Sequence, residues 1–186
     1  MTEPQLIQAL AQGQNSAFEV LVNEYKDRLY NTILGMVQSP ADAEDLLQDV
    51  FIKVFENIQK FKGESALSTW MYRIAVTHSL DFLRRKNRKK RLGNILAWFG
   101  AGEAGETAEF VHPGVLAENK ERATHLFKAI NTLPENQKTA FVLQKVEGMN
   151  QKDISVIMDL KEGAIESLLM RAKANLKKSL INYYSS

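Results

Sequence analysis

Apolar residues recur at helical spacing along almost the whole chain, and no stretch shows the convincing alternation of a strand. In residues 18–37 they share one helical face: Phe18, Leu21, Val22, Tyr25, Leu29, Ile33 and Val37. Residues 40–58 carry a wider stripe: Ala43, Leu46, Leu47, Val50, Phe51, Val54, Phe55 and Ile58. The pattern predicts an all-α fold.

Local signals give the expected ends of these helices. Ser39 is a good N-cap, Pro40 suits the first helical position, and Asp42 stands where a capping carboxylate belongs. Residues 61–68 contain Gly63 and two serines and are predicted to form a loop. A third long helix is expected from about Ser68 into a basic cluster.

The second half of the chain is helical again, after a change in composition. Residues 92–116 are rich in glycine, contain Pro113-Gly114, and are typical of a linker, although the apolar "ILAWF" within them suggests docking. Two small helical domains are therefore predicted, residues 1–91 and 117–186, joined by the linker 92–116. Because a linker permits movement, we expect the free domains to close on each other and hide surfaces.

Charge is concentrated in the cluster RRKNRKKR, which holds seven basic residues in positions 84–91, although the net charge is only +2. Six basic and eleven acidic residues precede the cluster, and eleven of each follow it. Such a focused patch suggests a specific polyanion, either nucleic acid or an anionic membrane. Cations also favour the C-terminal end of a helix, so a solvated helix end fits as well.

The sequence has few features typical of an enzyme or a metal-binding protein. The three histidines lie far apart, and no HExxH motif, phosphate loop or nucleophile elbow is present. The acidic face of residues 42–53 lacks histidine and a second carboxylate helix, so a solvated or protein-docking face is favoured over a metal site. We expect no enzyme activity, cofactor or metal. The absence of cysteine, signal peptide and membrane span suits a cytoplasmic protein.

A helix-turn-helix is indicated in residues 150–184, where a short helix, a brief break and a longer helix follow one another. The second helix of this motif presents its N-terminal residues to the major groove of DNA. A plain helical hairpin has the same spacing, and the pattern alone leaves both open.

Three segments together resemble the extracytoplasmic-function sigma factors, the small two-domain members of the bacterial sigma-70 family. They are "DAEDLLQDVFIKVF", "FKGESALSTWMYRIAVTHSLDFLRRKNRK" and "LPENQKTAFVLQKVEGMNQKDISVIMDLKEGAIESLLMRAKANLKK". The resemblance spans residues 16–178, with the segments in the family's order and spacing. It implies a transcription initiation factor that binds core RNA polymerase and directs it to the −10 and −35 elements of promoters.

The resemblance also implies site residues. Contacts with the polymerase, at the clamp helices of the largest subunit, fall to Asp45, Gln48, Asp49 and Phe51, and the flap is a further partner. Recognition and melting of the −10 element fall to Lys62, Gly63, Glu64, Ser65, Arg73, Thr77, His78, Asp81, Arg84, Arg85, Lys86 and Arg88. Contacts with the −35 element fall to Gln151, Lys161, Glu162, Ala164, Glu166, Ser167, Met170 and Arg171. An anti-sigma factor is a further possible partner.

The chain departs from the family's usual residues at three of these positions or their neighbours. Thr77 stands where the family usually has Asn, while Glu166 and Leu168 stand where it usually has cations. We therefore expect fewer phosphate contacts from the recognition helix, and Glu166 could accept a hydrogen bond from cytosine N4. The alternatives are a helix-turn-helix regulator that binds duplex DNA without polymerase and a peripheral membrane protein.

Overall fold

The computed structural model describes the backbone of residues 1–98 and 120–184, with side chains for residues 1–89 and 125–181. Within these ranges the chain forms α-helices and one short 3-10 helix, and no strand, which confirms the predicted all-α fold. The elements are α1 (Glu3–Ala11), α2 (Asn15–Val37), α3 (Pro40–Asn57), η1 (Ile58–Lys60), α4 (Leu67–Trp98), α5 (Lys120–Asn131), α6 (Glu135–Lys145), α7 (Gln151–Met158) and α8 (Glu162–Tyr184).

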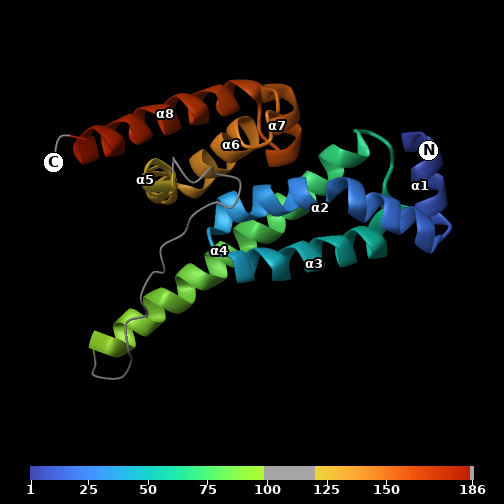
Figure 1. Ribbon diagram of the computed structural model, residues 1–186, viewed down its shortest axis with the longest axis horizontal. Helices are drawn as coiled ribbons and strands as arrows, with labels where there is room; N and C mark the ends of the chain where they lie inside the picture. The colour runs from blue at the N-terminus through green and yellow to red at the C-terminus, as the bar shows by residue number, and fades with distance from the viewer. Residues whose placement is uncertain (99–119, 185–186) are drawn as a thin grey trace.

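Two groups of helices lie against each other (Figure 1). Helices α2, α3 and α4 pack together with α1 at one end, while α5 to α8 form the second group. Contacts of α4 with α7 and of α2 with α6 join the groups. The distal part of α4, which includes the basic cluster, projects beyond α3 (Figure 1).

One hydrophobic core runs through both groups. Leu21, Leu29 and Ile33 of α2 are fully buried in the same cluster as Val142, Leu143 and Ile154 of the second group. A smaller cluster, centred on Phe127, Ile130 and Leu176, lies between α5 and α8. Because burial of apolar surface is the main stabilising term in folding, the shared cluster also holds the two groups together.

The predicted cap of α3 is present, and α7 has a similar one. The Ser39 hydroxyl accepts from the Asp42 amide at 3.4 Å, and the Asn150 side-chain oxygen accepts from the Asp153 amide at 2.9 Å. Gly148 has a φ of +69°, which suits glycine in the turn after α6. Asp159, with a φ of 55°, ends α7 in the left-handed conformation. Asp159 thus begins the short turn of the helix-turn-helix, while Asn150 caps the start of its first helix.

Asn150→Ala is expected to lower the free energy of unfolding by about 1 kcal/mol, because the α7 N-terminus loses its side-chain acceptor. Urea denaturation followed by circular dichroism measures the change. Asn23→Ala, at an exposed position inside α2, is the matched control and should not destabilise the chain. Equal losses in both variants would contradict the capping role.

Three features differ from the sequence-based expectations. Helix α1 was not expected, and its Glu3 carboxylate accepts from the Leu67 amide at 3.2 Å, so it caps the N-terminus of α4. Helix α4 continues to Trp98, so residues 92–98 of the predicted linker are helical, while 99–116 lie outside the described residues. Phe55 was expected in the core but is 52% exposed. The division into domains 1–91 and 117–186 stays a prediction.

Candidate functional site

The outer face of α3 is acidic and has an apolar centre. Asp45, Gln48 and Asp49 are exposed there, as predicted for docking residues. Ile52, 53% exposed, and Glu56 follow at helical spacing on the same face. Sequence inspection missed Ile52, although an apolar residue at the centre of a polar stripe was the available signal.

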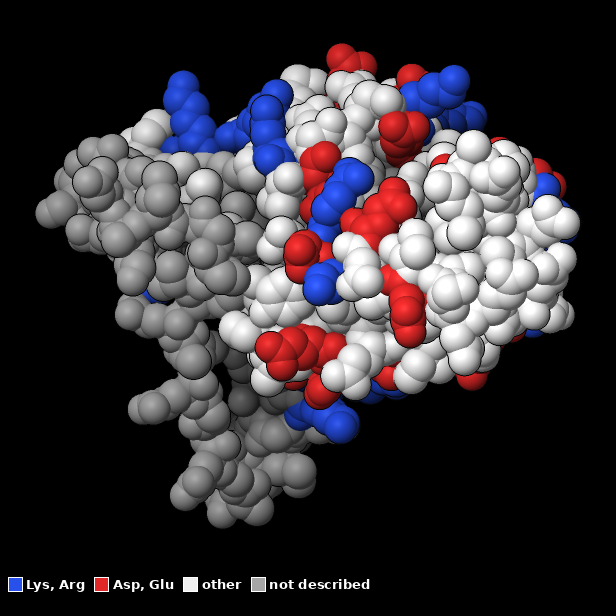
Figure 2. All heavy atoms as spheres, turned by 45° about the vertical axis from the view of Figure 1, so that its right-hand side comes forward, with Lys and Arg blue, Asp and Glu red and all other residues white. Residues whose placement is uncertain are grey.

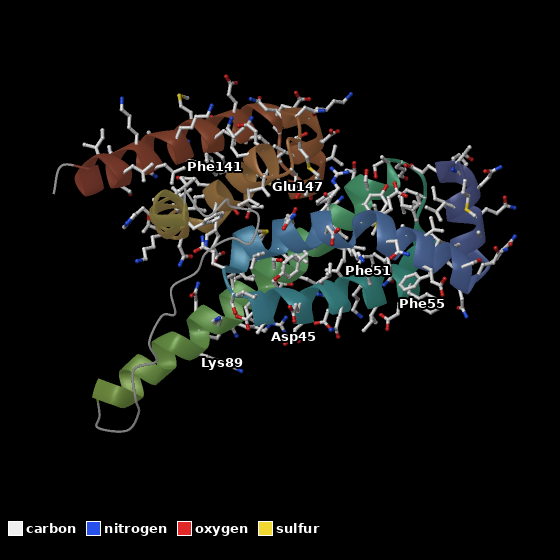
Figure 3. All side chains as sticks on the ribbon, in the orientation of Figure 1. Asp45, Phe51, Phe55, Lys89, Phe141 and Glu147 are labelled. Atoms are coloured by element: carbon white, nitrogen blue, oxygen red, sulfur yellow. The ribbon has the colours of Figure 1, made fainter. Side chains whose placement is uncertain are left out.

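Phe51 was predicted to contact the polymerase, but its side chain is buried in the hydrophobic core. The residue is 8% exposed, and its ring packs edge-on against Phe18, with ring centroids 6.3 Å apart. Phe55 lies at the edge of the same aromatic group, 5.4 Å from Phe18 (Figure 3). Phe51 therefore positions α3, and the exposed apolar surface of the helix comes from Ile52 and Phe55.

The predicted loop, which holds the first four residues assigned to the −10 element, joins η1 to α4. Lys62, Gly63 and Glu64 are exposed, and Ser65 is half-buried. Gly63 has a φ of +70°, a conformation that favours glycine. The Glu3 cap fixes the far end of this loop at Leu67. The loop is thus exposed in its middle and held at its α4 end.

A pocket of about 420 Å³ opens beside this loop, between α3, η1 and α4. It brings together Arg73, Thr77 and His78, three of the residues predicted to touch the −10 element. The rest of its lining was not predicted: Lys53, Asn57, Lys60, Trp70 and Ile74. The Trp70 ring packs against Phe61, with centroids 5.3 Å apart. An aromatic wall among cations can stack a nucleobase and hold its phosphate.

The remaining −10 candidates follow along α4 and are exposed. Arg84 reaches Asp81 at 3.3 Å, and the Arg85 guanidinium donates to the Asp81 carbonyl at 3.3 Å. Lys86 pairs with Asp42 of α3 at 2.7 Å. Arg88 and Lys89 lie on the part of α4 that projects beyond the body, where Figure 3 shows Lys89.

The helix-turn-helix consists of α7 and α8. Its predicted −35 residues Gln151, Lys161, Glu162, Ala164, Glu166, Met170 and Arg171 are all exposed. Ser167 is half-buried and donates its hydroxyl to the Gly163 carbonyl at 2.9 Å. Ile165 and Leu169 face the core. The N-terminal part of α8 is therefore anchored to the core by its inner face, and its outer face is exposed to solvent.

A polar cluster joins the two helix groups. The Tyr72 hydroxyl of α4 donates to the Glu147 carboxylate at 2.6 Å, and Arg28 of α2 lies 3.4 Å from the same carboxylate. Burial, and then the hydrogen bond to Glu147, raise the pKa of Tyr72 above its usual range, so the hydroxyl stays a donor. Burial lowers the pKa of Lys138, which also lies at this junction.

Figure 2 shows acidic side chains in a band through the middle of the view, with basic ones among them and a largely uncharged area to the right. In the described ranges no group of His, Asp and Glu could hold a metal ion. Among the same residues, no helix is both long and apolar enough to cross a membrane.

Comparison with known proteins agrees with this geometry. A family model for sigma-70 region 2 matches residues 21–89, and one for sigma-70 region 4 matches residues 126–176. The ECF RNA polymerase sigma-E factor of Haemophilus influenzae is 32% identical over 97% of this chain and 96% of its own length. The chain belongs to the extracytoplasmic-function group of the sigma-70 family. The family resemblance of the three sequence segments is thereby confirmed.

Two further proteins resemble the chain, one in sequence and one in fold. The RNA polymerase sigma-H factor of Pseudomonas aeruginosa is 29% identical over 96% of this chain and 93% of its own length. A solved structure of CnrH in complex with the cytosolic domain of CnrY shares the fold, with a TM-score of 0.70, 18% identity and 97% coverage of both chains. As a sigma factor, the chain is a transcription initiation factor that acts with core RNA polymerase at promoter DNA. The family is one of non-enzymatic factors.

Proposed function

We propose that the outer face of α3 docks this sigma factor on core RNA polymerase, with Asp45, Gln48 and Asp49 around Ile52. Carboxylates around an apolar centre fit a complementary basic surface, because the charges orient the partner and the apolar side chain is buried. The region 2 model covers α3, and the acidic face of this helix has no metal-binding group that would explain it otherwise in the described ranges.

The pocket beside the loop is the proposed capture site for an unpaired base of the −10 element. The observation that carries this assignment is that Trp70, Arg73, Thr77 and His78 line one pocket next to residues 62–65. A base removed from the stack costs a few kcal/mol, which stacking and hydrogen bonds in a pocket offset. Arg84, Arg85, Lys86 and Arg88 supply sequence-independent affinity for the adjoining phosphates.

Promoter melting tests this assignment. Promoter fragments selected from genomic DNA by the reconstituted holoenzyme should show permanganate-reactive thymines near −10 only when both the protein and core polymerase are present. Melting by core polymerase alone, or no melting with both, would contradict the proposal.

The exposed start of α8 is proposed to read the −35 element in the major groove. Lys161 and Arg171 are suited to phosphate or guanine, while Glu166 is suited to cytosine N4. The chain itself is proposed to have no catalysis and no cofactor, to act in the cytoplasm, and to be open to control by an anti-sigma factor.

Glu166→Ala is expected to remove the preference for cytosine at one position of the −35 element, a loss of about 1–3 kcal/mol of discrimination. Selection from a promoter library randomised at this element measures the preference. Glu19→Ala removes one exposed negative charge from α2 and is the control. If Glu166→Ala kept the preference for cytosine, Glu166 would not contact that base.

The alternative of a regulator that binds duplex DNA without polymerase is less well supported. It accounts for the helix-turn-helix but leaves the acidic face of α3 and the pocket beside α4 without a role. Co-purification with core polymerase separates the two functions, since only the sigma factor should co-elute with the enzyme.

A further inference from the structure

Helix α1 precedes residues 21–89, the part of the chain that the region 2 family model matches. It is nevertheless fixed in the structure, because Leu6, Ala9 and Leu10 are buried in the main hydrophobic core. Figure 1 shows α1 at the end of the molecule where the chain passes from η1 to α4. The proposed contacts with polymerase and DNA leave this helix without a role.

Helix α1 contacts both ends of the loop formed by residues 61–66. It packs against η1, which precedes the loop. Its Glu3 carboxylate accepts from the amide of Leu67, the first residue of α4, at 3.2 Å. Among the described residues, no backbone–backbone hydrogen bond holds residues 62–65, so the position of the loop depends on its two ends.

The start of α4 depends on this acceptor because the residue at its own N-cap provides none. The Ala66 carbonyl accepts from the Trp70 amide at 3.2 Å, which places Ala66 at the N-cap. An alanine has no side-chain oxygen to accept from the first amides of a helix. The neighbouring Ser65 hydroxyl donates to the Ala66 carbonyl at 3.3 Å. Glu3 therefore takes the place of the missing cap, and its negative charge suits the positive end of the helix dipole.

Two walls of the pocket begin at the points that α1 holds. Lys60 lines the pocket from η1, while Trp70 and Arg73 line it from the first two turns of α4. The Phe61 ring of the loop packs on the Trp70 ring, with centroids 5.3 Å apart. A base can stack and bond in such a pocket only if the walls keep their spacing, so fraying of the first turn of α4 would weaken its binding.

We propose that Glu3 is a positioning residue for capture of the unpaired −10 base. It links α1 to the N-terminus of α4, keeps Trp70 and Arg73 in place opposite Lys60, and acts on the base only through these residues. The selectivity of the chain for the captured base then depends on a helix that precedes the matched region. This inference rests on the proposed function of the pocket.

Glu3→Ala is expected to lower the preference for one base at the captured −10 position by about fivefold, because a side-chain cap stabilises a helix end by about this factor. Selection by the reconstituted holoenzyme from a promoter library randomised at the −10 element measures the preference. Glu3→Gln keeps a side-chain oxygen that can accept from the Leu67 amide, and it should retain most of the preference. The affinity for core polymerase and the preference at the −35 element should not change in either variant.

Two controls separate positioning from a loss of charge or of stability. Glu19→Ala removes one exposed carboxylate from α2. Asn150→Ala removes a side-chain cap from α7, at a similar expected cost in stability, and leaves the start of α4 intact. Neither variant should alter the preference at the −10 element. An equal loss of this preference in Asn150→Ala and Glu3→Ala would mean that overall stability sets the preference, and it would overturn the inference.

Fluorescence of Trp70 tests the same contact without polymerase or DNA. The chain has two tryptophans, so Trp98→Phe leaves Trp70 as the only one. In this background Glu3→Ala should increase the quenching of Trp70 by acrylamide, because the first turn of α4 opens to solvent more often, and Glu19→Ala should not. Unchanged quenching would show that Glu3 does not hold this turn and would overturn the inference.

The selection experiment distinguishes failure of the inference from failure of the proposed function. If the natural chain selects a base at the −10 element and Glu3→Ala selects it as strongly, Glu3 has no positioning role and the function of the pocket stands. If the natural chain selects no base there, the proposed function of the pocket fails and the inference fails with it. Circular dichroism of each variant checks that it is folded.

Discussion

Ile52→Glu is expected to weaken binding to core RNA polymerase by at least about 100-fold, or about 3 kcal/mol. Ile52 lies at the centre of the acidic α3 face and is 53% exposed, so the substitution is tolerated in the free chain. In the complex the new carboxylate would be buried where an apolar contact is expected, beside Asp45 and Asp49. Competition with a labelled natural chain for core polymerase measures the loss.

Val20→Glu is the matched control for this substitution. Val20 is 43% exposed on α2, outside the α3 face, and the change introduces the same carboxylate. It should leave the affinity for core polymerase nearly unchanged. Natural affinity in Ile52→Glu would show that the polymerase does not cover this part of α3.

Trp70→Ala is expected to reduce open-complex formation by roughly 10- to 100-fold, because stacking of one base on an aromatic ring contributes about 1–3 kcal/mol. Trp70 lines the pocket together with Arg73 and Thr77. Binding to core polymerase should be unaffected, since the α3 face is not altered. Permanganate reactivity at the −10 element, with holoenzyme at saturation, measures the open fraction.

Two further variants separate stacking from packing. Trp70→Phe keeps an aromatic ring in the pocket and should retain much of the activity. Phe82→Ala also removes a half-buried aromatic side chain from α4, but outside the pocket. Equal losses in Trp70→Ala and Phe82→Ala would mean that Trp70 serves the packing of α4 alone.

Much of the fold could be predicted from the sequence because its signals are local. The periodicity of residues 18–37 corresponds to α2, and Ser39 and Asn150 cap α3 and α7 as their positions indicate. The short break before α8 follows from the same kind of signal. Helix α1 has only nine residues, and its cap on the Leu67 amide lies far along the chain, so its own pattern did not lead to a prediction.

The candidate site was predictable in its parts and not in its geometry. Phe51 and Phe55 both fit an apolar stripe, and only the packing of Phe18 against them shows which one is buried. Glu147 gave no signal, because its partners Tyr72 and Arg28 lie 75 or more residues away in sequence. Contacts between the helix groups depend on tertiary packing, which no local pattern encodes.

Transcription in vitro with core bacterial RNA polymerase, with and without this protein, on a library of genomic promoters tests the central claim most directly. The account predicts new start sites, each preceded by two elements at a fixed spacing, that appear only when the protein is added. Binding of the protein to duplex DNA with no association with polymerase and no new start sites would contradict it.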